Sequence, residues 1–213
     1  MKSAHRKTKA WARLSSDDRQ RHTLDFAFRS ESLAWTLNFT PKQEARLRKS
    51  KRPVKNALAD AINRACKREL GYAPPISLAL EVTPGGRLHA HGIVTLGRRQ
   101  GAAFCRALKS AGGKVHGCGA GRQTDIRRLW SAAGWAAYIA KAFDQTAAAL
   151  GTDKIVYQCR ATVAGARAEY EASLRRQKAH RKTQGRPADS VRQVGVISGV
   201  GPGRHDQAAL GVI

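Results

Sequence analysis

Two histidines separated by a single residue, His89 and His91, are the first residues of this chain whose spacing suggests chemistry. They lie in a run typical of a β-strand, where side chains alternate with a period of two, so both imidazoles point to the same face. Their Cα atoms then lie about 6.5–7 Å apart, which lets both rings reach one metal ion. A single His-x-His pair is common, so its meaning depends on the residues that accompany it.

A carboxylate can join this pair if the preceding hairpin has the right register. Two runs of alternating apolar and polar residues are joined by Pro-Gly-Gly at 84–86, which supplies a turn. A two-residue turn sets Glu81 opposite Ala90, whereas a three-residue turn with a left-handed glycine sets Glu81 opposite His89. Only the second register keeps the large apolar residues of both strands on one buried side. We therefore expect Glu81, His89 and His91 to converge on the open face.

Tyr138 and Lys141 are a second pair with chemical potential. They are three residues apart in a stretch whose pattern predicts a helix from about 131 to 150, so they are neighbours on one helix face. Such pairs are frequent on helices, where the tyrosine packs and the lysine is solvated. The pair indicates a catalytic role only in combination with the histidine cluster and the positive charge of the chain.

The composition indicates a polyanionic partner. The chain has 213 residues, a formal net charge of +24 and a pI near 11, although 42% of its residues are hydrophobic. Nucleic acid is the first candidate partner, and an anionic membrane surface is the second. We expect no membrane-spanning segment, since no run of about 18 apolar residues occurs. The N-terminus lacks the apolar segment of a secretory signal and the four cysteines are scattered, which favours a cytoplasmic protein with reduced thiols.

The elements that must position these residues can be read from the periodicity. The strand at 32–40 has large apolar residues at its odd positions, so one face packs on a core and the other offers Thr36 and Asn38 to a ligand. We expect a basic arm over 1–30, one domain over 31–178 and a flexible basic tail over 179–213. Further helices are predicted over 42–47, 54–70, 98–110 and 164–178, and further strands over 78–82, 88–96, 114–116, 124–130 and 154–159.

Taken together, these features resemble the HUH endonuclease superfamily, specifically the rolling-circle replication initiators with a single catalytic tyrosine. Three family motifs occur in family order: the apolar strand Ala34–Pro41, the His-hydrophobic-His motif in Leu88–His91, and the Tyr-x-x-Lys motif in Tyr138–Lys141. Glu81 stands where many members carry a third metal ligand. The resemblance covers roughly residues 32–150. One departure is the small Ala90 inside the histidine motif. Position 142 is Ala, so the second tyrosine that some members carry four residues after the first is absent, and the resemblance is to the single-tyrosine members.

The resemblance implies an α+β fold of the RRM-like kind, with a central antiparallel sheet of about five strands, helices packed on one face and the active site on the other. It implies that Tyr138 attacks a phosphodiester of single-stranded DNA, with Lys141 adding positive charge. It further implies a metal site at Glu81, His89 and His91. Mixed imidazole and carboxylate ligands suit Mn²⁺ well, and Mg²⁺ is the abundant alternative.

The same resemblance implies the biology of the reaction. The product is a 5′-phosphotyrosine link with a free 3′-hydroxyl, and the reaction starts rolling-circle replication of a bacterial plasmid or phage. The expected partners are an origin hairpin, a host replication helicase and a second protomer on the DNA. Thr36, Asn38 and Arg87 are the expected DNA contacts, since they share a strand face with the histidines or neighbour it.

Several alternatives stay open at this point. Two histidines and a carboxylate also describe non-haem iron oxygenases and cupins, but neither class explains the charge or the Tyr138–Lys141 pair. Transposases and relaxases share the histidine pair, yet relaxases usually carry the tyrosine before it. A non-catalytic basic protein that binds nucleic acid is the strongest alternative from another class. In that case the histidines face a groove of the nucleic acid and have no catalytic role.

Overall fold

A computed structural model describes residues 9–97 and 99–184 of the chain. The first eight residues of the expected arm and residues 185–213 of the expected tail lie outside the described residues. Contacts divide the chain into one compact unit up to Arg176 and a second unit from Gln177 on. None of the helices in the described part is both long and apolar enough to cross a membrane.

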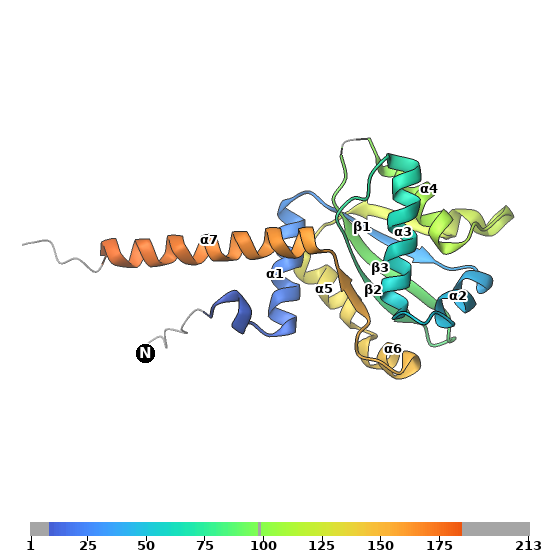
Figure 1. Cartoon of the computed structure of the whole chain (residues 1–213), viewed down its shortest axis with the longest axis horizontal. Coiled ribbons are helices and arrows are strands. Elements are labelled where there is room, and N and C mark those ends of the chain that lie inside the picture. The colour runs from blue at the N-terminus through green and yellow to red at the C-terminus, as the bar shows by residue number, and fades with distance from the viewer. Residues whose placement is uncertain (1–8, 98, 185–213) are drawn as a thin grey trace, which may run out of the picture. The chain divides into compact units, whose positions relative to one another are not determined.

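The centre of the first unit is a five-stranded antiparallel sheet (Figure 1). The strands lie in the order β4-β1-β3-β2-β5, and each pair of neighbours runs antiparallel. The α+β class and the five-stranded antiparallel sheet are confirmed. The strand bounds are β1 Leu33–Asn38, β2 Ile76–Val82, β3 Leu88–Val94, β4 Thr124–Arg128 and β5 Val156–Gln158.

The first face of the sheet is covered by α2 (Pro41–Arg48), α3 (Val54–Leu70) and α4 (Gly101–Gly112), which lie together in Figure 1. The helix α3 has the bounds that its apolar spacing predicts. Its Leu58 and Ile62 are fully buried against the sheet. Gly71 ends it in the left-handed conformation, with φ +83°, and its N–H bonds to the Lys67 carbonyl.

The second face is also partly covered, by α1 (Ser16–Arg29) and α5 (Ala132–Ala140). Leu24 of α1 and Trp135 of α5 belong to a second buried cluster, which includes Ala34 and Ala79 of the sheet. These small strand residues let the helices approach closely. The other end of this face, toward the β2–β3 turn, carries Glu81 and the two histidines.

The N-terminal segment packs against the folded unit from residue 9 onward, although we expected a basic arm there. The short 3₁₀ helix η1 (Trp11–Arg13) buries Trp11 beside Ala166 of α7 (Arg160–Gln184). The Tyr170 hydroxyl donates to the Lys9 carbonyl at 2.7 Å. The few apolar residues of this segment form a small cluster of their own, in which Trp11 and Leu14 are buried with Ala166.

Two other elements differ from the sequence-based expectation. The helix expected over 131–150 is two helices, α5 and α6 (Phe143–Leu150), and the break lets the Thr146 hydroxyl accept from the backbone N–H of Val82 at 2.9 Å. The strand expected over 114–116 is absent from the described structure. The N–H of Val115 bonds instead to the side chain of Gln123, and the 3₁₀ helix η2 (Gly117–Arg122) follows.

Candidate active site

The β2–β3 hairpin has the register that brings Glu81 alongside the histidines. The Thr83 N–H donates to the Arg87 carbonyl at 2.9 Å, which closes a three-residue turn over 84–86. Gly86 takes φ +76°, the left-handed conformation that such a turn requires. Glu81 therefore pairs with His89 across the ladder. The odd-length turn expected from the hydrophobic pattern is confirmed.

The side chains of Glu81, His89 and His91 meet on this face, and together they could hold a metal ion. One candidate ligand atom from each residue lies within 4.8 Å of the others. The Glu81 Oε2 atom is 2.5 Å from Nε2 of His91 and 3.7 Å from Nε2 of His89. Imidazole nitrogens and a carboxylate oxygen are common ligands of divalent transition metals in proteins.

Hydrogen bonds from β1 orient both imidazoles. The Thr36 hydroxyl lies 3.0 Å from Nδ1 of His91, and Oδ1 of Asn38 lies 3.2 Å from Nδ1 of His89. The Asn38 amide donates to the Arg122 carbonyl at 2.8 Å, so its oxygen must face His89. Nδ1 of His89 is then the donor, and Nε2 keeps its lone pair for a ligand.

The cluster has one unsatisfied atom that fits a bound cation. Nε2 of His89 is buried and has no hydrogen-bond partner among the described residues. Buried polar atoms are rarely left without a partner, and a cation bound between the three side chains would satisfy this nitrogen. The donor set, its hydrogen-bonded support and this atom together fit a metal ion.

The electrostatics of the cluster favour ligands in their metal-binding forms. Burial alone raises the pKa of Glu81, but nearby His91 and Lys141 outweigh it and lower that pKa. Burial lowers the pKa of both His89 and His91, although Glu81 opposes the shift. Near neutral pH the carboxylate is therefore ionised and the imidazoles are neutral, which are the protonation states that coordinate metals.

Tyr138 and Lys141 lie directly beside the cluster. The Tyr138 ring meets the His91 ring edge-on, with 5.0 Å between centroids, and Tyr138 is 40% exposed to solvent. Nζ of Lys141 lies 4.0 Å from the Tyr138 ring centroid and 3.4 Å from Oε1 of Glu81. The structure thus brings all five expected catalytic and metal residues together from β2, β3 and the end of α5.

Trp135 is a member of this site that sequence reasoning missed. Its ring stacks on Tyr138 with 5.2 Å between centroids and meets His91 edge-on at 6.1 Å. It lies one helical turn before Tyr138, so the same spacing that linked Tyr138 to Lys141 could have found it. Its effect is to limit how far the Tyr138 ring can move.

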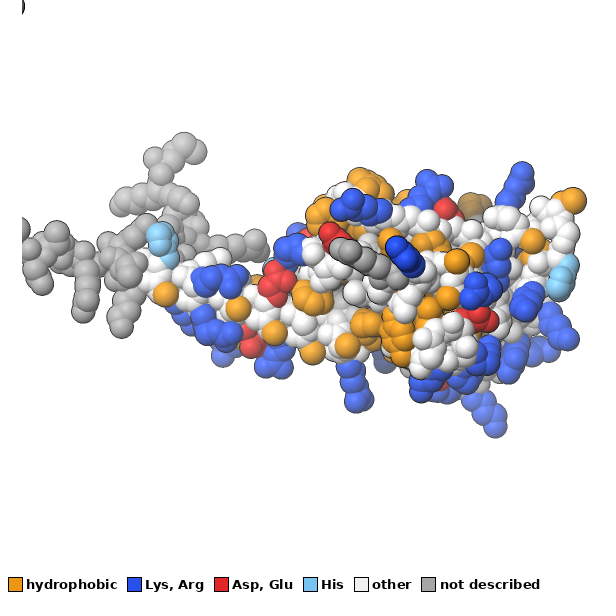
Figure 2. All heavy atoms as spheres, turned by 90° about the horizontal axis from the view of Figure 1, so that it is seen from above, with side chains coloured by type: hydrophobic (Ala, Val, Ile, Leu, Met, Phe, Trp, Pro, Cys, Tyr) orange, Lys and Arg blue, Asp and Glu red, His pale blue; other side chains and the backbone are white. Residues whose placement is uncertain are grey.

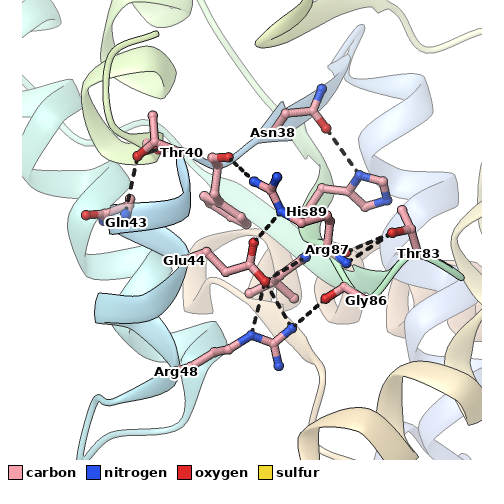
Figure 3. A network of polar contacts seen from close by, with 12 residues as sticks. Asn38, Thr40, Gln43, Glu44, Arg48, Thr83, Gly86, Arg87 and His89 are labelled. Atoms are coloured by element: carbon pink, nitrogen blue, oxygen red, sulfur yellow. Dashed lines mark hydrogen bonds and ion pairs between the residues drawn. The ribbon is translucent and has the colours of Figure 1, made fainter.

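Arg87, which we expect among the DNA contacts, directs its guanidinium toward α2. Its guanidinium donates to Oε2 of Glu44 at 2.9 Å and to the Phe39 carbonyl at 3.0 Å (Figure 3). Glu44, on α2, also accepts from the Leu88 N–H and from Arg48. Burial raises the pKa of Glu44, but these donors outweigh it and lower the pKa. The network ties the turn end of the β2–β3 hairpin to α2.

A hollow of about 300 Å³ opens beside Tyr138. We call it the aromatic groove, and its lining includes Thr36, Asp125, Trp130, Trp135 and Tyr138. Trp130 is 68% exposed, which is unusual for so large an apolar side chain. Two arginines of β4, Arg127 and Arg128, also line the groove, together with Ala34 and Trp35 of β1.

Comparisons with protein-family models, with curated proteins and with solved structures each found no match to this chain. Functional conclusions therefore depend on the residues of the site and on their geometry.

Proposed function

We propose that this protein is a metal-dependent enzyme that nicks and rejoins single-stranded DNA through Tyr138, as the resemblance to single-tyrosine rolling-circle initiators implies. The observation that carries the proposal is the position of Tyr138 and Lys141 against the Glu81–His89–His91 cluster. These residues come from separate elements, and a structural packing role would not require three candidate metal ligands, two of them buried, directly beside a solvent-exposed tyrosine and a lysine.

The reaction is a transesterification at phosphorus. The Tyr138 oxygen forms a bond to the phosphorus as its hydroxyl proton is lost, and the bond from phosphorus to the 3′-oxygen breaks. The 3′-oxygen leaves and takes up a proton as the free hydroxyl. The 5′-phosphotyrosine keeps the energy of the phosphodiester, so a 3′-hydroxyl can reverse the step and join strands.

Each side chain of the site has a role in this scheme. A tyrosine hydroxyl, with an ordinary pKa of about 10, needs help to act as a nucleophile near neutral pH. Lys141 places a positive charge between Tyr138 and Glu81, where the phosphate would gain negative charge. Thr36 and Asn38 act as positioning residues, because each bonds to a histidine.

Glu81, His89 and His91 would hold the metal, for which Mn²⁺ fits the mixed ligands best and Mg²⁺ is the abundant alternative. A divalent ion bound there would polarise the scissile phosphate and stabilise the departing oxygen.

The charge of the chain supports a nucleic-acid substrate. The net charge is +24, and Lys and Arg side chains are spread over much of the face shown in Figure 2, where acidic side chains are few. Such a surface attracts phosphate backbones from a distance and accelerates encounter. We propose a bacterial plasmid or phage as the source of the substrate, with an origin hairpin, a replicative helicase and a second protomer as partners.

Formation of a covalent adduct tests the proposal. The protein is incubated with Mn²⁺ and a labelled pool of single-stranded oligonucleotides of random sequence, and SDS-resistant complexes are counted. We expect an adduct that is abolished by Tyr138→Phe and by His89→Ala. The matched control is Tyr72→Phe, because Tyr72 is 39% exposed, nearly the same as Tyr138.

Two outcomes would contradict this function. Salt-sensitive binding without any adduct would favour the non-catalytic binding protein. An adduct that persists in Tyr138→Phe would assign the nucleophile to another residue.

A further inference from the structure

The two edges of the sheet differ in how their outward backbone groups are covered. At the edge formed by β2 and β5, the N–H of Val82 donates to the Thr146 hydroxyl of α6 at 2.9 Å. The carbonyl of Val156 accepts from Nζ of Lys55, on α3, at 2.7 Å. Side chains of two helices therefore cap part of this edge.

The strand β4 forms the opposite edge, and its register determines which backbone groups face outward. Gln123 and Leu129, at its two ends, form backbone hydrogen bonds to the chain of β1 and the residue before it. Bonding residues alternate along an antiparallel strand, so Asp125 and Arg127 also direct their backbone groups toward β1.

The intervening residues Thr124, Ile126 and Arg128 direct their N–H and C=O groups away from the sheet, about 6.8 Å apart. These backbone groups form no hydrogen bond within the described part of the chain. We call this row of three residues the β4 edge. An uncovered edge of this kind is a template on which another extended chain can pair.

The side chains along this edge are positively charged. Arg128 is exposed, and its guanidinium has neither an ion pair nor a hydrogen bond among residues 9–97 and 99–184. Arg127 is also exposed and pairs with Asp125 at 2.7 Å. A second copy of the chain would bring its own net charge of +24 to this edge, which opposes self-pairing, whereas an acidic segment would be attracted.

The backbone groups favour a peptide over a nucleic acid. Donors and acceptors lie side by side along the β4 edge. Phosphate oxygens can accept from the N–H groups, but the neighbouring carbonyl oxygens repel them. An extended peptide supplies both a donor and an acceptor at every second residue, with the same spacing as the edge.

We propose that the β4 edge binds an extended, acidic segment of a partner protein, which adds a sixth strand to the sheet. Backbone hydrogen bonds to Ile126 and Arg128 supply affinity, and the arginine side chains select acidic residues. The added strand would lie beside the aromatic groove, which Arg127 and Arg128 also line. The inference goes beyond the proposed function, because it requires no chemistry at Tyr138.

Amide hydrogen exchange followed by NMR on the full chain tests the proposal. The probe is a peptide of alternating glutamate and valine, about seven residues long, which suffices to span β4. At saturation it should slow exchange of the Ile126 and Arg128 N–H groups at least about tenfold. The N–H groups of Asp125 and Arg127 should change less, because they already bond to β1.

A modified peptide separates backbone pairing from attraction between charges. N-methyl groups on two adjacent central residues keep its charge and side chains but block one donor on each edge of the peptide. Each intermolecular hydrogen bond contributes a few-fold in affinity, and the methyl groups also obstruct close approach, so binding should weaken at least about tenfold.

Two substitutions at one position make the same separation in the protein. Arg128→Ala removes only the charge and should weaken peptide binding about threefold. Arg128→Pro also removes the outward N–H, which an edge strand tolerates, and should weaken binding about fivefold further. The matched control is Gln158→Pro, at an outward position of β5, which should leave affinity within about twofold of the parent.

Four outcomes would overturn the proposal. They are equal binding of the methylated and unmethylated peptides, equal affinities of Arg128→Ala and Arg128→Pro, and no slowing of exchange at about 1 mM peptide. The fourth is slowing at Ile126 and Arg128 without peptide, either with rising protein concentration or with oligo-dT, which would assign the edge to a second copy or to nucleic acid. The exchange experiment uses the unaltered chain, so it remains decisive even if a proline variant fails to fold.

Discussion

Replacement of Thr36 by valine is a direct way to ask whether the histidines serve as metal ligands. The substitution keeps the branched shape but removes the hydroxyl that lies 3.0 Å from Nδ1 of His91. His91 is only 2% exposed, so water cannot easily replace the lost partner. We expect the imidazole to lose its fixed orientation and its preferred tautomer, and the affinity for metal to fall.

The magnitude follows from two independent considerations. A buried polar group without a partner costs about 1–3 kcal/mol. At about 1.4 kcal/mol for each factor of ten, this corresponds to roughly 5- to 150-fold in affinity when the whole cost falls on the metal-bound state. Loss of an outer hydrogen bond to a metal-binding histidine typically lowers affinity about 10- to 100-fold. We therefore expect Thr36→Val to bind Mn²⁺ about 10- to 100-fold more weakly than the parent.

The assay is a titration followed by the electron paramagnetic resonance signal of free Mn²⁺. The conservative variant Thr36→Ser retains a hydroxyl, so its affinity for Mn²⁺ should stay within about threefold of that of the parent. If Thr36→Val bound Mn²⁺ as tightly as the parent while His89→Ala lost binding, the orienting role of Thr36 would be refuted. If neither variant changed binding, the cluster itself would not be the metal site.

Three further predictions concern the hairpin, the α2 network and Lys141. Gly86→Ala places a side chain at φ +76° and should destabilise the fold by about 1–2 kcal/mol in urea denaturation, whereas Gly85→Ala, without such a φ, should cost less. The lowered pKa of Glu44 means that its stabilising contribution is present above the ordinary value of about 4.3 and is lost as pH falls through the lower folded value. Unfolding free energy should thus fall more steeply below pH 4.3 in the parent than in Glu44→Gln, and equal pH profiles would contradict this. Lys141→Ala should slow adduct formation by about 10²-fold with Mn²⁺ affinity nearly unchanged, and an unchanged rate would remove Lys141 from the mechanism.

Much of the site could be predicted because it depends on local patterns. Strand alternation determined which face each residue takes, and the need to bury the apolar residues of both strands selected the three-residue turn. That choice placed Glu81 opposite His89 as observed. The spacing of Tyr138 and Lys141 likewise predicted that they share a helix face.

The remaining features depend on contacts between distant parts of the chain. Arg87 alternates correctly with the histidines, but a flexible side chain at a strand end can turn toward Glu44, and only the position of α2 reveals this. The break after Ala140 has no glycine or proline to signal it, and it is explained by the bond between Thr146 and Val82. The sequence did not predict that α1 packs on the sheet, because Leu24 and Ala27 form too short an apolar pattern to indicate a buried helix.

The most direct test of the central claim is to locate the covalent bond. After reaction with Mn²⁺ and single-stranded DNA, the adduct is digested with protease and nuclease, and the modified peptide is sequenced by mass spectrometry. We predict that the nucleotide mass is carried by Tyr138 near the end of α5, next to Lys141 and the Glu81–His89–His91 cluster. A nucleotide on any other residue, or no modified peptide under conditions in which the protein binds Mn²⁺ and DNA, would contradict it.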